Sequence, residues 1–215
     1  MAIFFQDTFT AGSDEALSAH TPDIGTSWTN LWSGGGADFG VVALTDVVTG
    51  NTVDNDGVIY TADTTYATAD YDVSIDIAAL FGTGATFYLL ARLQDQENMY
   101  GIRFGSNGSN DIYKKVTGTW SLILTGTAGY TLATTVALRV QGTTIAQVND
   151  GVVVDSVTDA DIATAGKGGM AGGGGAELAI STNDWKSTAI FDNFSIATIS
   201  TGTTGPSLLT TLNAG

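Results

Sequence analysis

Two aspartates four residues apart are candidates for acid–base chemistry. Asp72 and Asp76 alternate with apolar residues, so they share one face of an extended strand and lie about 13 Å apart along it. Glycoside hydrolysis needs two carboxyl groups about 5–9.5 Å apart, one on each side of the scissile bond. The pair is too widely spaced for that role, and we expect it to lie on a solvated sheet face.

Nucleophilic catalysis has few candidate residues in this chain. His20 is the only histidine, and it lies beside Pro22 and Trp28 in a turn-rich segment. The chain has no cysteine and no Gly-x-Ser-x-Gly sequence, which would mark a nucleophile elbow. We therefore expect His20 to be structural and the protein to be non-enzymatic.

Two segments resemble sites for ions. Residues 52–63 place Asp54, Asp56 and Asp63 at spacings that partly match an EF-hand loop, but Thr52 occupies the first ligand position and no helices flank the segment. A hairpin turn is the favoured interpretation. The glycines of residues 166–175 lack the Lys-Ser/Thr pair and the following helix of a phosphate-binding loop, so they predict tight packing around Lys167.

Aromatic residues beside polar ones could bind sugars, because a ring face stacks on a pyranose and polar groups bond its hydroxyls. Trp120 and Tyr113 flank an expected hairpin and are the strongest candidates, with Tyr100 and Arg103 as further members. Large aromatic residues are more often core residues, which is the competing interpretation. The remaining candidates are Trp28, Trp32, Trp185, Arg92 and Asn98.

Composition excludes several classes of protein. The 215 residues are 43% hydrophobic and 13% charged, which is too apolar for a disordered chain. The chain is rich in Thr and Gly, which are weak helix formers, so a helical bundle is excluded. The net charge of −15, with seven scattered basic residues, opposes binding to nucleic acid or to an anionic membrane. Residues 1–7 lack the features of a signal peptide, and no apolar run is long enough to span a bilayer.

Short alternating segments separated by Gly, Asn and Asp turns predict an all-β protein. In the clearest strand, residues 71–80, Val73, Ile75 and Ile77 share one face. The best local candidate for a helical turn is residues 159–164. Further strands are expected at residues 87–93, 98–104, 112–116, 120–124, 136–141, 144–148, 152–157 and 188–199.

Five motifs in order resemble the concanavalin A-like jelly-roll superfamily, in its laminin-G-like and glucanase-like branch. They cover residues 1–199, which we expect to form one β-sandwich domain, with residues 200–215 as a C-terminal arm. The motifs are Phe5-Gln6-Asp7-Thr8-Phe9 with residues 17–28, then residues 95–103, residues 138–152, residues 158–170, and Ile190-Phe191-Asp192-Asn193-Phe194-Ser195.

The resemblance implies that the first and last strands pair. It also implies Ca²⁺ as a possible cofactor, with Asp7, Asp192 and Asn193 near the paired termini as ligands; capping of turns is their alternative role. The glucanase branch carries Glu-x-Asp-x-x-Glu on one strand, and none of Glu15, Glu97 and Glu177 lies in that pattern.

The opening motif is similar to a form found in tailed-bacteriophage proteins. We therefore expect a structural virion protein, either a head decoration or fibre protein or a tail component, assembled in the host cytoplasm. It would bind other virion proteins and form a homo-oligomer, with the uncharged arm as a fastening segment. The alternative is a lectin-like module that binds host glycans. The fold alone does not decide between the virion role and the lectin-like role.

Overall fold

The computed structural model describes residues 2–11, 13, 15–33, 38–42, 47–51, 58–64, 66, 68–80, 86–105, 110–127, 134–172 and 189–199. Asp54, Asp56, Trp185, Glu177 and the expected arm lie outside these residues. Strands form nearly all of the regular structure described, and one 3₁₀ turn, η1 (Leu17–Ala19), is added to them. No helix in the described ranges is long and apolar enough to cross a membrane.

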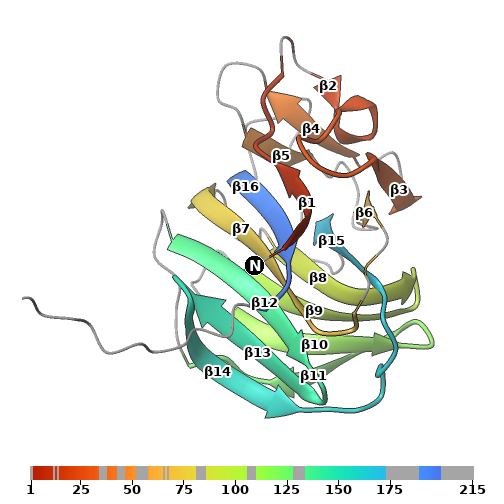
Figure 1. Cartoon of the computed structure of the whole chain (residues 1–215), viewed down its shortest axis with the longest axis vertical. Helices are drawn as coiled ribbons and strands as arrows, with labels where there is room; N and C mark the ends of the chain where they lie inside the picture. Colours follow the sequence, from red (N-terminus) through yellow and green to blue (C-terminus); the bar gives the residue numbers. More distant parts are fainter. Residues whose placement is uncertain are drawn as a thin grey trace, which may run out of the picture.

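The described strands form two antiparallel sheets that pack face to face, so the expected all-β sandwich is confirmed (Figure 1). The larger sheet has the order β14 (Val152–Thr158), β13 (Thr144–Asn149), β12 (Thr134–Gln141), β7 (Tyr71–Leu80), β16 (Ala189–Ala197), β5 (Val47–Asn51), β4 (Asp38–Val42) and β2 (Glu15–Ala16). The smaller sheet has the order β11 (Thr119–Leu124), β10 (Asn110–Val116), β9 (Asn98–Gly105), β8 (Thr86–Asp95), β15 (Lys167–Gly172), β6 (Val58–Asp63) and β3 (Ser27–Ser33).

Strand β1 (Ile3–Asp7) pairs with β16, which confirms the expected pairing of the first and last strands. Phe5 lies opposite Ile196, and Asp7 lies opposite Phe194. The other half of β16 pairs along the same edge with β5, where Phe191 lies opposite Val48. Two strands from distant parts of the chain therefore share one edge of β16, and its other edge pairs with β7.

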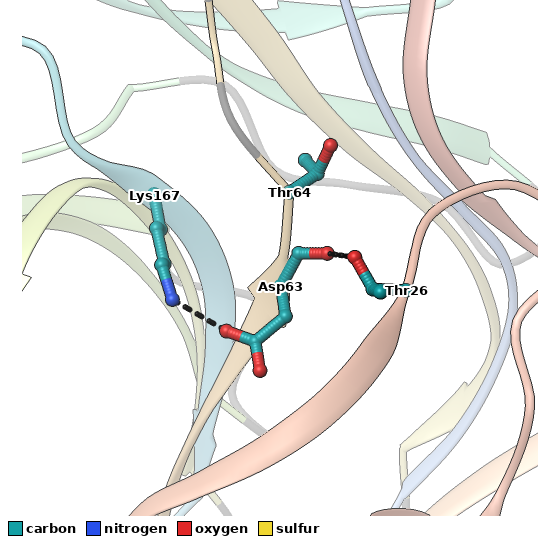
Figure 2. Close-up of a pocket in the computed structure, with 4 residues that line it drawn as sticks. All are labelled: Thr26, Asp63, Thr64 and Lys167. Carbon is teal, nitrogen blue, oxygen red and sulfur yellow. Dashed lines mark hydrogen bonds and ion pairs between the residues drawn. The ribbon is translucent and has the colours of Figure 1, made fainter.

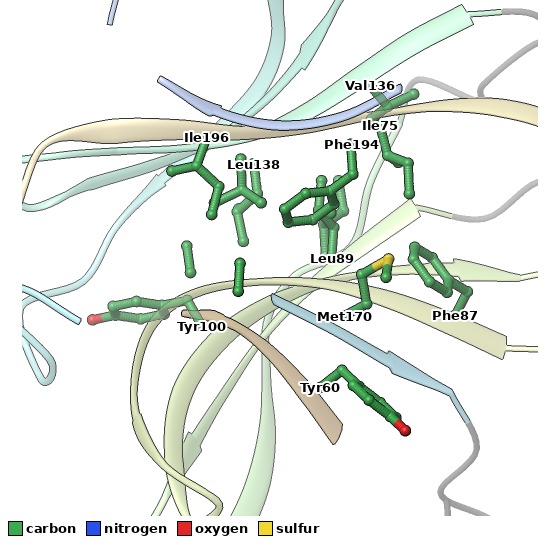
Figure 3. Close-up of a cluster of buried hydrophobic side chains, with 14 of the residues drawn as sticks. Tyr60, Ile75, Phe87, Leu89, Tyr100, Val136, Leu138, Met170, Phe194 and Ile196 are labelled. Atoms are coloured by element: carbon green, nitrogen blue, oxygen red, sulfur yellow. The ribbon is translucent and has the colours of Figure 1, made fainter. Parts of the chain in front are cut away.

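The core lies between the two sheets, and the alternation expected for residues 71–80 is confirmed. Val73, Ile75 and Ile77 are fully buried, whereas Asp72, Ser74 and Asp76 on the opposite face are half-buried. Side chains of the two sheets point toward each other in Figure 3. The residues labelled there are Tyr60, Ile75, Phe87, Leu89, Tyr100, Val136, Leu138, Met170, Phe194 and Ile196.

The glycine-rich segment forms a central strand, β15, between β8 and β6. A Cβ atom on Gly169 would collide with the carbonyl oxygen of Tyr60, and one on Gly168 would lie 2.6 Å from Cδ1 of Ile196. The glycines are therefore needed because the neighbouring strand and the opposite sheet approach β15 closely. This agrees with the expected tight packing.

Residues 159–164 form bends and no helical turn, so that prediction is wrong. The segment is held by side chains instead of by its own hydrogen bonds. The backbone N–H of Ile162 donates to the Tyr100 hydroxyl at 3.1 Å, and its carbonyl accepts from Arg92 at 2.9 Å. Long-range contacts to two buried side chains thus replace the local hydrogen bonds of a helix.

Candidate functional site

The outer face of the smaller sheet carries most of the candidate sugar-binding residues. In β9, Tyr100, Ile102 and Phe104 point into the core, and successive side chains alternate between faces. Arg103 therefore lies on the outer face, as do Met99 and Gly101. Antiparallel pairing places Tyr113 of β10 opposite Gly101, and Trp120 of β11 opposite Lys115.

Three aromatic rings meet on this face and, with Arg103 and Lys115, form what we call the aromatic surface. The ring centroids of Tyr88 and Trp120 are 5.1 Å apart with an interplanar angle of 23°, which is a stacked arrangement. Tyr113 contacts both rings edge-on, at 6.2 Å from Tyr88 and 6.3 Å from Trp120. Tyr113 and Trp120 remain partly exposed, so a ligand can reach this cluster.

Two cations lie over the rings. The Arg103 guanidinium carbon is 5.0 Å from the Tyr113 centroid, and the Lys115 ammonium is 5.7 Å from the Trp120 centroid. Arg103 also donates to Asp111 at 2.6 Å, and Lys115 donates to the Gln96 carbonyl at 2.7 Å. Burial lowers the pKa of Lys115, and the carboxylates of Glu97 and Asp95 oppose this effect. Rings and nearby hydrogen-bond donors are the two requirements for binding a sugar.

A second hydrophobic cluster surrounds the rings. Leu90 and Met99 are fully buried although they belong to the outer face, and they pack with Tyr88, Leu93, Ile59 and Ala171. The outer face of a sandwich sheet normally alternates to polar residues. An apolar outer face with partly exposed aromatic rings is typical of recognition surfaces.

The structure brings together three of the four predicted sugar-binding residues: Trp120, Tyr113 and Arg103. Tyr100 is fully buried on the opposite face of β9, and its hydroxyl donates to Asp159 at 2.6 Å. Tyr100 is therefore a core residue and does not belong to the aromatic surface. Sequence reasoning missed Tyr88 and Lys115, although alternation from Leu89 and Tyr113 would have assigned both to the outer face.

The other aromatic and polar candidates have separate roles. Trp28 is 2% exposed in the core, and Trp32 on β3 is 38% exposed. Arg92 is buried, and Asn98 bonds the carboxylate of Asp95 within a turn.

The predicted calcium ligands Asp7, Asp192 and Asn193 are each hydrogen-bonded within the protein. Asp7 is 1% exposed, and its carboxylate accepts hydrogen bonds from the Phe9 backbone, from His20 and from Trp28. The Asn193 amide donates to Asp76 at 2.8 Å, and Asp192 accepts from the Asn193 backbone. Within the described ranges, no three His, Asp or Glu residues are placed to hold a metal.

His20 is buried between two carboxylates at the junction of β1, β2 and β3. Its Nε2 lies 3.0 Å from Asp7, and its Nδ1 lies 2.6 Å from Glu15. Trp28 Nε1 donates to the other oxygen of Asp7 at 2.5 Å. Burial lowers the pKa of His20, but hydrogen bonds and charges from Asp7 and Glu15 outweigh burial and raise it above its ordinary value.

The carboxylates of Asp72 and Asp76 accept hydrogen bonds from side chains of neighbouring strands. Arg139 donates to both oxygens of Asp72, at 2.8 and 2.7 Å. Asp76 accepts from Thr135 and from Asn193. These contacts are what the expected sheet-face role requires.

No family model matches the sequence, and no curated protein matches it. Solved structures match its fold. The carbohydrate binding module CBM66 from Bacillus subtilis has a TM-score of 0.55 at 16% identity, over 80% of this chain and 95% of that one. The beta-glucanase of Bacillus licheniformis has a TM-score of 0.51 at 16% identity, over 87% and 97%. Domain 4 of the extracellular arabinanase AbnA from Geobacillus stearothermophilus, in complex with arabinotriose, has a TM-score of 0.50 at 14% identity, over 90% and 91%.

The chain therefore has the concanavalin A-like lectin/glucanase β-sandwich fold. At these identities the likeness concerns the fold alone. It is shared by binding modules and by a glucanase, so the choice between these activities depends on the residues of this chain.

Proposed function

We propose that this protein is a carbohydrate-binding module and that the aromatic surface is its glycan-binding site. The observation that carries the proposal is the meeting of Tyr88, Tyr113 and Trp120 with two cations on an apolar outer sheet face. A sugar ring would pack against the exposed part of Trp120 and Tyr113, and Arg103 and Lys115 would donate to its hydroxyls. The fold shared with CBM66 and with the arabinotriose-bound domain supports this function.

We propose binding without hydrolysis. On the described part of the aromatic surface, Arg103 holds the Asp111 carboxylate at 2.6 Å, and the carboxylates of Glu97 and Asp95 interact with Lys115. Glu15 bonds His20 at the other end of the fold, and Glu97 lies in the turn that joins β8 and β9. A glycosidase needs two carboxyl groups across one bond, and our proposal assigns no such pair to this surface.

Trp120→Ala is expected to weaken glycan binding about tenfold or more, because truncating a central aromatic anchor costs about 2 kcal/mol. The measurement is a glycan array with purified protein, followed by calorimetric titration of the best ligand. Trp32→Ala is the matched control, since Trp32 lies on the opposite edge strand of the same sheet. It should bind as the unaltered protein does. A blank array, or equal losses in both variants, would contradict the proposal.

A structural role in the virion of a tailed phage is a second proposal, and it can hold together with the first. It rests on the sequence form of residues 5–28 and on the uncharged composition of residues 201–215. Deleting residues 200–215 should abolish incorporation into particles and leave the sandwich folded, as followed by particle sedimentation and circular dichroism. Normal incorporation of the shortened chain would refute the fastening role of the arm.

A further inference from the structure

A shallow pocket lies on the smaller sheet, away from the aromatic surface. Thr26 before β3, Asp63 and Thr64 at the end of β6, and Lys167 at the start of β15 line a volume of about 550 Å³ (Figure 2). This volume falls within the range of small-molecule sites. Lys167 and Trp120 lie on strands four positions apart in the sheet, roughly 19 Å, so one sugar ring cannot contact both.

The pocket is built around a bonded pair of opposite charges. The Lys167 ammonium lies 2.5 Å from one carboxylate oxygen of Asp63, toward which it points in Figure 2. The second oxygen accepts from Ser27 at 3.2 Å and from Thr29. Thr26 donates its hydroxyl to the Asp63 carbonyl at 2.6 Å. A cation, a carboxylate and several hydroxyls are thus fixed at neighbouring positions.

The charges of this pair select the class of ligand. Burial raises the pKa of Asp63, but hydrogen bonds from Lys167, Thr29 and Ser27 outweigh burial and lower it, so the group stays ionised at neutral pH. An anion would be attracted by Lys167 but repelled by Asp63. A metal ion would meet the ammonium beside the carboxylate. A neutral ligand that both donates and accepts hydrogen bonds fits the pair best.

We propose that the Asp63–Lys167 pocket is a second sugar-binding site, which takes a neutral sugar through two adjacent hydroxyl groups. One hydroxyl donates to Asp63, and the other accepts from Lys167. This inference rests on the proposed function, because it assigns a further site to a carbohydrate-binding module. The two sites together would let one molecule bind two glycan segments, which raises the effective affinity for a polymer.

The test is a nuclear magnetic resonance titration of the ¹⁵N-labelled full chain with arabinotriose and with a trisaccharide of β-linked glucose. We expect shifts of the Thr64 and Gly168 amides from this pocket, and of the Trp120 indole N–H from the aromatic surface. Lys167→Met keeps the alkyl stem and removes the ammonium. It should weaken binding at the Thr64 and Gly168 amides about tenfold and leave the Trp120 response unchanged.

Trp120→Ala is the reciprocal control and should leave the pocket response intact. If Lys167→Met lowers the spectral quality of a folded protein, Thr26→Val removes a hydroxyl from an exposed position and should weaken the same amide shifts. Trp120 shifts without pocket shifts would overturn this inference and leave the proposed function standing. The absence of shifts at both places with both sugars would overturn both proposals.

Discussion

Replacing Arg92 by methionine is expected to lower the free energy of unfolding by about 3–5 kcal/mol. The side chain is 1% exposed and donates to three main-chain carbonyls, those of Ala69, Gly142 and Ile162, at 3.2, 2.8 and 2.9 Å. Hydrogen bonds from a charged group are worth roughly 1.5–3 kcal/mol each, and bonds in one network do not add fully. The measurement is urea unfolding, with the midpoint and the slope fitted separately.

Arg139→Met is the control for the loss of an arginine. Arg139 pairs with the Asp72 side chain at the sheet surface, and its loss should cost about 1 kcal/mol or less. Arg92→Lys should recover only part of the stability, because one ammonium cannot reach carbonyls that lie in three directions. If the two variants lost equal amounts of stability, the hydrogen bonds of Arg92 to main-chain carbonyls would not be a major source of stability.

Raising the pH through the pKa of His20 is expected to destabilise the fold. The carboxylates of Asp7 and Glu15 favour the imidazolium, so the pKa of His20 is higher in the folded chain than in the unfolded one. Its contribution is therefore complete below the unfolded value of about 6.5 and is lost as the pH rises through the folded value. The loss is about 1.4 kcal/mol for each tenfold difference in proton affinity between the two states.

His20→Gln separates this effect from every other titration. The chain has one histidine and no cysteine, so no other side chain has an ordinary pKa between about pH 6 and 8. Urea midpoints measured across this range should fall for the unaltered protein and stay level for the variant. Parallel curves for the two proteins would mean that folding does not shift the pKa of His20.

The strands that sequence reasoning identified are those whose pattern is local. β7 alternates strictly, and β10 with β11, and β12 to β14, are hairpins joined by short turns. The strands that it missed depend on their neighbours. β15 is rich in glycine, which strands disfavour, and it exists because β6 and β8 pair with it on both sides.

The candidate site was predictable to the extent that it lies in one hairpin. Tyr113 and Trp120 flank a single turn, so their proximity follows from the chain itself. Tyr88 comes from β8, two strands from β10, and only the register of the sheet brings its ring to Trp120. The link between Asp63 and Lys167 spans 104 residues and also depends on strand order.

The central place of β16 in its sheet sets the order in which the protein can fold during synthesis. β7 and β1 both pair with this strand, so their hydrogen bonds to it cannot form until residue 197 has left the ribosome. A nascent chain that stalls before residue 189 exposes two unpaired edges, which invite pairing with other chains. Folding should therefore be concerted and late, as its many long-range pairings also imply, and brief delays near the codons of β16 should increase aggregation more than delays elsewhere.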